Sequence, residues 1–255
     1  MSNPVNAKKN NDPWDSPGLV QSKIAPVPLH IDYPHLVDLN DFMKAHASVE
    51  ALTILDYGAG ASPYKVYFPN ADYRRADITD APTLRYKIKP DSTIAEADET
   101  FDLIISTQVA EHVPNPDVYF KECFRLLKSG GKLILTTHGI WDEHGSPYDF
   151  QRWTDSGLIR DLKHVGFKQP EIFKLTCGMR AALLIFTRTL FTTTPPAPPM
   201  RRFFFKAFRW FYSKIIPNLY QLGDRWFPQD KIVKVNEGGS PTPIWYIVIA
   251  TVVRK

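Results

Sequence analysis

The pattern of apolar and polar positions divides the chain into short strands alternating with helices. Apolar runs typical of strands buried on both faces occur at 52–56, 101–107 and 132–136. Apolar residues at helical spacing predict helices over 36–43, 116–127 and 155–165. Weaker strands are predicted at 72–77, 84–88 and 171–176, a short helix at 63–68, and a central strand at 243–253. This order predicts one α/β domain built on a mostly parallel sheet.

Local signals mark the ends of two of these helices. Asn115 as the N-cap and Pro116 at the first helical position indicate a helix start, and the glycine-rich run 129–131 is expected to end that helix. Thr154 is expected to cap the next helix, which Gly166 ends. The sequence thus predicts both the start and the stop of each helix.

A long insertion, 178–240, precedes the final strand. Its proline-rich segment 192–199 cannot be regular helix and divides the insertion in two. In the second half, basic residues recur at helical spacing beside a broad aromatic face, at Arg202, Lys206 and Arg209. This combination is typical of a helix lying on an anionic membrane, but packing over the active site or against a second subunit is the commoner fate of an aromatic stripe. The first half is too short, and too interrupted by Arg188, to span a bilayer.

Length and composition narrow the function classes. At 255 residues the chain can hold one sizeable core, expected over 31–255, after a flexible polar arm at 1–30 that lacks the apolar run of a signal peptide. A net charge of +4 is too small to indicate a nucleic-acid partner. Cys123 and Cys177 lie far apart and are expected to be buried free thiols. We expect a cytoplasmic protein. The aromatic helix is the candidate contact with the inner face of the membrane, and a homodimer is its other candidate use.

The most informative stretch is ILDYGAGASPY, residues 54–64. A strand that enters a small-residue loop and then a helix start is typical of nucleotide-type ligand sites, because such a loop offers backbone N–H groups to the ligand. A dinucleotide site requires glycine or alanine three residues after its second glycine, and here that position is Pro63. Asp56 would repel a pyrophosphate, but it suits the positively charged amino group of a methionine moiety. The stretch therefore favours S-adenosylmethionine over a nicotinamide dinucleotide.

At these residues the chain resembles the class I S-adenosylmethionine-dependent methyltransferases, whose first motif reads D/E-x-G-x-G-x-G. The segment D-Y-G-A-G-A-S departs from that motif only at Ser62, which replaces glycine. Downstream, FDLIIS-QVAEHV and RLLKSGGKLILTT resemble later motifs of the type 11 methyltransferase group. The resemblance implies a Rossmann-like fold: a seven-stranded, mostly parallel sheet with helices on both faces, a last strand inserted antiparallel, and here an aromatic-rich insertion before that strand.

The resemblance also implies roles for the cofactor-site residues. It assigns the methionine part to Asp56, Gly58, Ala59 and Gly60, the ribose to Asp77, the adenine to Asp91 and the pocket wall to Gln108. Asp77 is supported in addition by its position about twenty residues past the loop, where such folds place a carboxylate on a ribose. The alternative is that Asp77 or Asp80 caps a turn, since the run DITDAP is also typical of capping.

The loop after 132–136 is the expected site of the second substrate, because a doubly wound fold binds ligands beyond the carboxyl ends of its strands. Its chemically capable residues are His138, Trp141, Asp142, Glu143, His144, Tyr148, Asp149, Arg152 and Trp153. His138 is the first candidate general base and His144 the second, since histidine titrates near neutrality. The alternative is a loop in which Asp149 and Arg152 simply pair and the aromatic rings pack. His112, after Glu111, is expected to shape the cofactor pocket.

Other chemistries have less support. The spacing of His138, Asp142, Glu143 and His144 does not match a helical two-histidine motif, so no metal site is predicted. A serine hydrolase would need a G-x-S-x-G elbow, which the sequence lacks. The sequence therefore predicts an S-adenosylmethionine-dependent methyltransferase acting on a small-molecule, lipid or saccharide-type acceptor. Its rivals are a non-catalytic module of the same fold that recruits a partner or membrane through 178–240, and a nicotinamide-dependent oxidoreductase.

Overall fold

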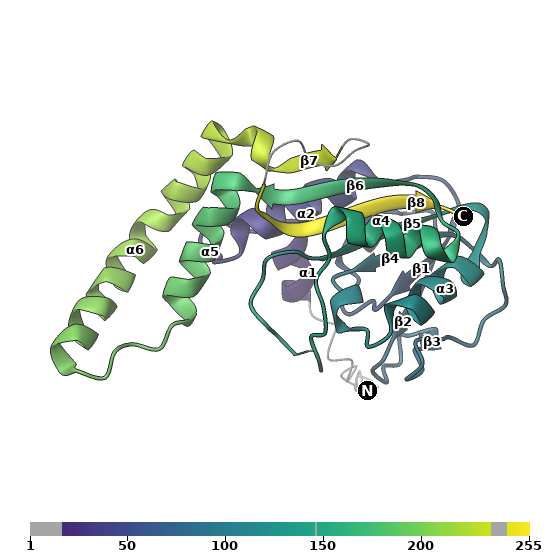
Figure 1. Ribbon diagram of the computed structural model, residues 1–255, viewed down its shortest axis with the longest axis horizontal. Coiled ribbons are helices and arrows are strands. Elements are labelled where there is room, and N and C mark those ends of the chain that lie inside the picture. The colour runs from purple at the N-terminus through teal and green to yellow at the C-terminus, as the bar shows by residue number, and fades with distance from the viewer. Residues whose placement is uncertain (1–16, 146, 236–243) are drawn as a thin grey trace, which may run out of the picture.

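The computed structural model describes residues 17–145, 147–235 and 244–255. Within them, one mixed sheet has eight strands in the order β3-β2-β1-β4-β5-β8-β6-β7 (Figure 1). The strands are β1 Thr53–Tyr57, β2 Asp72–Asp77, β3 Tyr86–Lys87, β4 Phe101–Thr107, β5 Leu127–His138, β6 Lys168–Cys177, β7 Ile232–Val235 and β8 Tyr246–Arg254. Pairing is parallel among β1 to β5, whereas β8 runs antiparallel to both β5 and β6, and β7 runs antiparallel to β6.

Helices cover both faces of this sheet. They are α1 Pro17–Ile24, α2 Tyr33–Ala45, α3 Pro116–Leu126, α4 Asp155–Val165, α5 Gly178–Thr192 and α6 Pro199–Trp226, with short 3-10 segments η1 Pro63–Tyr67, η2 Ala110–His112 and η3 Pro228–Asp230. On one face, α3 and α4 contribute Phe120 and Leu162 to an apolar core; on the other, α2 contributes Leu39 and Phe42 to a second core. The sheet is therefore sandwiched, as the resemblance implies.

The apolar run of β4 shows why its strand could be predicted. Ile104 belongs to the first core, while Leu103 and Ile105 belong to the second. Because alternate side chains point to opposite faces, a strand covered on both sides needs apolar residues at every position. The expected seven strands are all present, and the inserted β8 lies between β5 and β6 as expected. The eighth strand, β7, comes from the insertion and extends the sheet at its edge.

Three local expectations differ from the structure. Of the expected arm, 1–16 lies outside the described residues, but Pro17–Ile24 form a helix that contacts α2 and η1. The segment after the glycine loop is a 3-10 helix, since Pro63 starts a piece of only five residues. The helix α3 ends at Leu126 and β5 begins at once, so the glycines at 130 and 131 lie inside a strand. Pairing of Phe101 with Leu127, before a register shift, extends β5 past those glycines.

The insertion forms a helical hairpin that projects from one end of the sheet (Figure 1). The proline-rich segment separates α5 from α6, as expected, but α6 continues through Pro217 to Trp226. Buried residues Tyr212, Ile216 and Tyr220 of α6 pack with Leu190 of α5, and Ile216 lies directly before the proline. This packing outweighs the one backbone hydrogen bond that a proline removes. Among the described residues, no helix combines the length and apolar character needed to cross a membrane.

Candidate active site

The carboxyl ends of β1, β2, β4 and β5 lie at one edge of the sheet because these strands are parallel. Asp56, Asp77 and His138 are at or next to the ends of their strands, and Gln108 directly follows β4. The loop after β3, which carries Asp91, reaches the same edge, since the Tyr57 hydroxyl donates to the Ser92 carbonyl at 2.7 Å. The predicted cofactor and acceptor residues therefore share one edge.

The glycine loop is built for close approach. Gly58 has a φ of +72°, and a Cβ added there would lie 2.4 Å from Cγ2 of Val109, so only glycine fits. The N–H groups of Gly58 and Ala59 both donate to the Ala76 carbonyl at 2.9 Å. The Gly60 N–H donates to Oδ2 of Asp77 at 2.9 Å. These three N–H groups are thus engaged within the protein, which differs from the expected loop of free donors; what the loop offers a ligand is space without side chains.

Asp77 links the end of β2 to this loop. Its Oδ1 accepts from the N–H and the hydroxyl of Thr79, each at 3.2 Å, while its Oδ2 accepts from Gly60. The turn contacts to Thr79 are those of the capping alternative, and the contact to Gly60 belongs to the loop. Asp80, the other residue in that alternative, is exposed and pairs with Lys87 at 2.7 Å. Of the two carboxylates, only Asp77 contacts the glycine loop.

Asp56 is a buried carboxyl group beneath the loop. Only 4% of the residue is exposed, and its Oδ2 accepts from the Tyr73 hydroxyl at 2.8 Å. Burial raises the pKa of Asp56 to about 6, although the hydrogen bond from Tyr73 and the charge of Arg75 oppose this. A carboxylate so poorly solvated gains strongly from a cationic group placed beside it.

Gln108 presents an unused acceptor at the same edge. It has a φ of +56°, and its N–H and Nε2 both donate to Thr136, at 2.8 and 3.2 Å. Its Oε1 is buried and has no partner among the described residues. A buried unpaired oxygen is costly, so a ligand that donates to it would be favoured. Asp91, by contrast, is exposed and its carboxylate accepts from Thr93.

The side chains at this edge can be compared with the chemical groups of S-adenosylmethionine. A buried carboxylate and an unpaired amide oxygen suit the ammonium of the methionine part, and a second carboxylate beside a glycine loop suits the ribose hydroxyls. A pyrophosphate would meet two carboxylates instead of free N–H groups. The residues present therefore fit S-adenosylmethionine and do not fit a dinucleotide.

His138, the last residue of β5, is buried, with only 4% of the residue exposed. Its ring stacks on Trp141 with centroids 4.6 Å apart and planes inclined by 11°, and its Nε2 lies 3.6 Å from Oε1 of Glu111. Burial lowers the pKa of His138 well below its usual range, so the ring is neutral near pH 7. Glu111 is fully buried, and its Oε2 accepts from the Thr137 hydroxyl at 2.7 Å.

His144 lies across from His138, with ring centroids 5.1 Å apart. Its N–H donates to Oδ2 of Asp149 at 3.0 Å, and its Nδ1 lies 3.4 Å from the same oxygen. Asp149 also pairs with Arg152, which lowers the pKa of Asp149 to about 2. The Asp149–Arg152 pair proposed as the structural alternative therefore exists, and it positions His144 at the same time.

The remaining residues of this loop are buried in the core, hold the loop to other elements or are exposed to solvent. Trp153 is buried against Phe120, while Tyr148 and Glu143 are exposed. Asp142 accepts from Arg188 of α5 at 2.9 and 3.0 Å. His112 contacts the carbonyl of Tyr148 through Nδ1 at 2.6 Å, and therefore ties the loop to η2.

Sequence reasoning missed three residues of this site. Glu111 was noted only as the neighbour of His112, although its carboxylate faces His138. His35 of α2 lies 5.6 Å from His138 between ring centroids. Arg188 lies with its guanidinium carbon 4.0 Å from the centre of the Trp141 ring. The motif EHV could have drawn attention to Glu111, but no local signal indicates that α2 and α5 reach β5.

The comparisons with known proteins agree with this fold. A family model described as a methyltransferase domain, of the type 11 group, matches residues 55–135. Two similar curated proteins are ubiquinone biosynthesis O-methyltransferases: one from Agrobacterium fabrum is 28% identical over 37% of this chain and 44% of its own length, and one from Xanthomonas oryzae pv. oryzae is 26% identical over 49% and 55%. The matched region thus spans about half the length of these relatives.

Structural similarity extends over most of the chain. The crystal structure of a SAM-dependent methyltransferase from Archaeoglobus fulgidus matches 93% of this chain and 99% of its own, with a TM-score of 0.50 at 12% identity. At that identity the match establishes the fold alone. Together with the family match, it confirms the Rossmann-like fold of class I S-adenosylmethionine-dependent methyltransferases that the sequence predicts, and residues 55–135 are similar to the type 11 methyltransferase-domain family.

Proposed function

We propose that this protein transfers a methyl group from S-adenosylmethionine to an oxygen of a hydrophobic small molecule. The observation that carries the proposal is the pairing of a buried carboxylate, Asp56, with a glycine loop held by a second carboxylate, Asp77. The non-catalytic alternative gives no reason to keep Asp56 buried and poorly solvated. We therefore favour the enzyme.

In this proposal the cofactor residues divide as the resemblance implies. Asp56 and the free Oε1 of Gln108 hold the ammonium, Gly58, Ala59 and Gly60 admit the methionine chain, and Asp77 binds the ribose. Asp91 lies at the adenine end, where its carboxylate is engaged by Thr93. Once bound, S-adenosylmethionine supplies the activated methyl group; the protein's part is to align the acceptor and exclude water.

The acceptor is assigned to the edge between β4 and β5. The side chain of His144 is 34% exposed there, while that of His138 is only 5% exposed. An acceptor hydroxyl would therefore meet His144 first, with His138 and Glu111 behind it. The curated relatives are named O-methyltransferases of ubiquinone biosynthesis, which supports an oxygen nucleophile on a hydrophobic molecule.

Calorimetric titration with S-adenosylmethionine and with S-adenosylhomocysteine tests the cofactor assignment. Binding should be saturable in the unaltered protein and lost in Asp56→Ala. The matched control is Asp72→Ala at the opposite end of β2, where the carboxylate is exposed and binding should persist. If the folded protein binds neither compound, the methyltransferase proposal is wrong; tight binding of reduced nicotinamide dinucleotide, followed by its fluorescence, would then favour an oxidoreductase.

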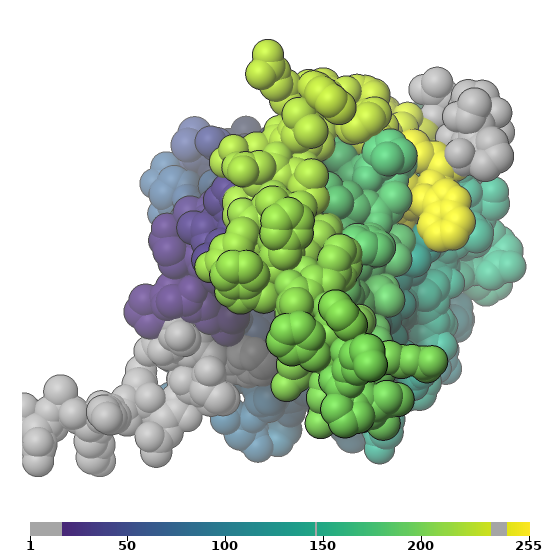
Figure 2. All heavy atoms as spheres, turned by 90° about the vertical axis from the view of Figure 1, so that its left-hand side faces the viewer, coloured from purple at the N-terminus to yellow at the C-terminus, as the bar shows by residue number. Residues whose placement is uncertain are grey.

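We propose in addition that α6 docks on an anionic membrane. Six large aromatic residues of α6 are 47% exposed or more, and we call this set the aromatic face: Phe203, Phe204, Phe208, Trp210, Phe211 and Trp226. Figure 2 looks onto the projecting hairpin, where the light-green side chains of α6 lie at the front of this face. A lid over the active site would bury them, so their exposure counts against that reading. A contiguous exposed apolar patch of this kind marks an interaction surface.

The basic residues around the aromatic face favour an anionic membrane as its binding partner. Five basic residues and no acidic residue lie between Pro199 and Gly223, and all five flank or interleave the aromatic face. Each contributes about 1 kcal/mol of attraction near an anionic bilayer. The hairpin also starts at the carboxyl end of β6, the same edge as His138, because β6 runs parallel to β5 through their shared neighbour β8. A membrane bound there would bring a lipid-soluble acceptor close to the site.

Flotation with liposomes tests this docking. The protein should float with vesicles of phosphatidylcholine and phosphatidylglycerol, and less with phosphatidylcholine alone. A triple variant Phe203→Ser, Trp210→Ser, Phe211→Ser should remain in the pellet fraction, whereas the control Tyr148→Ser, an exposed ring outside α6, should float. Equal behaviour of the two variants would contradict the proposal. Sedimentation velocity reports the competing use of the face, because a homodimer through α6 would dissociate in the triple variant without any flotation.

A further inference from the structure

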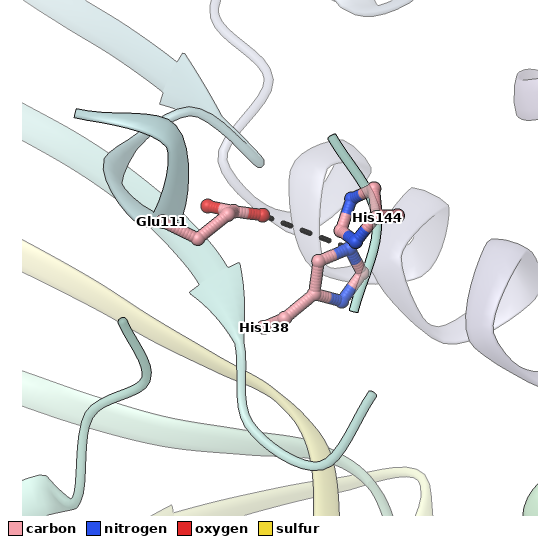
Figure 3. A group of neighbouring side chains, drawn as sticks. All are labelled: Glu111, His138 and His144. Atoms are coloured by element: carbon pink, nitrogen blue, oxygen red, sulfur yellow. Dashed lines mark ion pairs between the residues drawn. The ribbon is translucent and has the colours of Figure 1, made fainter. Parts of the chain in front are cut away.

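Three potential metal ligands converge at the acceptor edge. They are Glu111 from η2, His138 from the end of β5 and His144 from the loop that follows, and we call them the Glu-His-His cluster (Figure 3). One ligand atom from each lies within 4.8 Å of the others. In Figure 3 the carboxylate points toward Nε2 of His138, with the His144 ring across from both. The expectation of no metal considered only residues 138–144, so it omitted the carboxylate.

The buried carboxylate of Glu111 lacks a hydrogen-bond partner on one of its two oxygens. The residue is 0% exposed, one carboxylate oxygen accepts from Thr137, and Oε1 has no hydrogen-bond partner among the described residues. Nε2 of His138 lies 3.6 Å from Oε1, which is too long for a hydrogen bond. A buried carboxylate with an unpaired oxygen is costly, and a cation beside Oε1 would remove that cost.

The surroundings supply polar outer contacts for Glu111 and His144, whereas Nδ1 of His138 has no hydrogen-bond partner among the described residues. Thr137 orients Glu111 through a hydrogen bond of 2.7 Å, and Trp141 stacks on His138 and fixes the plane of its ring. Asp149, held by Arg152, lies 3.4 Å from Nδ1 of His144. A carboxylate beside the distal nitrogen of a histidine is the usual outer contact of a metal-bound imidazole.

We infer that the Glu-His-His cluster binds one divalent transition-metal ion, for which Zn²⁺ is the natural probe. Two neutral imidazoles and one carboxylate form the set found in catalytic zinc sites, which leave a coordination position open. Bonds of about 2 Å require the three ligand atoms to draw closer than 4.8 Å. His144 can close this gap because it is only half-buried and lies on a loop.

The inference deepens the proposed function. Metal binding itself does not depend on that function, but the role of the metal in the reaction rests on it. An acceptor hydroxyl at the open position would become more acidic and lose its proton to solvent. The oxygen then forms the new bond to the methyl carbon, and the electron pair of the broken carbon–sulfur bond stays on sulfur. His138 and His144 would act as ligands in this scheme, and not as the general bases expected from the sequence.

Zinc binding tests the site without measuring activity. The 255-residue protein is first stripped of metal with a chelator and dialysed. Calorimetry should give one equivalent of Zn²⁺, and Co²⁺ should produce the visible absorption of a low-coordinate site. Glu111→Gln and His144→Gln should each lower the affinity by at least about 10-fold, as even loss of an outer contact does. The control His164→Gln removes an exposed histidine on α4 and should bind like the unaltered protein.

Each outcome decides for or against the site. Should Glu111→Gln fail to fold, judged by circular dichroism, His144→Gln carries the test because its side chain is partly exposed. Uptake of less than one equivalent, or equal affinity of His144→Gln and His164→Gln, would overturn the inference. If S-adenosylmethionine binds normally in that case, only the metal site is wrong; if zinc binds as expected but S-adenosylmethionine does not, only the proposed function is wrong.

Discussion

Arg180 of α5 and Asp38 of α2 form an ion pair whose two side chains are 1% and 0% exposed, with Nη2 lying 2.7 Å from Oδ1 and 2.9 Å from Oδ2. Arg180 also pairs with Asp224 of α6, and the Thr176 hydroxyl donates to Asp38 at 2.8 Å. One guanidinium therefore joins the core helix α2 to both helices of the insertion.

Breaking this pair should destabilise the protein strongly. Arg180→Met leaves Asp38 buried and unpaired, and we expect a loss of about 3–5 kcal/mol in the free energy of unfolding measured with urea. The double variant Asp38→Leu, Arg180→Met removes both charges and should recover part of that loss. Equal loss in the single and double variants would show that packing, and not the unpaired charge, sets the effect.

Substitution of Gly58 should cost more than substitution of a glycine with similar backbone geometry. Gly58→Ala combines a φ of +72° with a contact of 2.4 Å to Val109, and should destabilise by at least about 2 kcal/mol. Gly130→Ala is the matched control, because its φ is +77° but nothing lies within 4 Å of an added Cβ. It should cost only about 1 kcal/mol. Thermal unfolding compares the two, and equal losses would mean that Val109 moves aside freely.

Asp77 and Asp80 should differ in their effect on cofactor affinity. Asp77→Ala removes the acceptor that holds Gly60 and the proposed partner of the ribose, so S-adenosylmethionine should bind about 10- to 100-fold more weakly. Asp80→Ala removes an exposed carboxylate paired with Lys87 and should leave binding unchanged. Calorimetry measures both. A larger loss of affinity in Asp80→Ala than in Asp77→Ala would show that Asp77 is not the carboxylate that binds the ribose.

Cofactor affinity should fall in acid because of Asp56. Its pKa is raised to about 6 by burial, so the carboxyl group is ionised above that pH and neutral below it. An ammonium prefers the ionised form; binding is therefore full above about pH 7 and weakens by up to tenfold for each unit below about 6. Asp56→Asn should bind weakly at every pH. The groups around Asp56 are Tyr73, Ser62, Arg75 and Asp77. A pH profile that is unchanged in Asp56→Asn would contradict the assignment of the titration to Asp56.

The shared edge of the candidate cofactor residues could be predicted because these residues are local in sequence. Asp56 and the glycine loop are continuous with β1, and Asp77 ends the next strand, so one motif and one spacing were enough. The Glu-His-His cluster could not be predicted in this way. Its position depends on the pairing of Thr107 with Thr136, which sets how η2 meets the end of β5.

The insertion shows a second limit. Helical spacing predicted the aromatic helix but not its length. The helix continues through Pro217 because Ile216 and Tyr220 pack on α5. That packing depends on the hairpin, which no single segment encodes. Arg180 and Arg188 likewise act through partners far away in sequence, Asp38 and Trp141.

The position of β8 has a consequence for synthesis on the ribosome. This strand is the last to be made of those in the sheet, yet it lies between β5 and β6 and pairs with both. Until residues 246–254 emerge, β5 has one open edge and β6 has no link to the parallel strands. The nascent chain therefore exposes the rings of α6 together with unpaired strand edges. A chaperone is most useful in the interval before β8 pairs with β5 and β6.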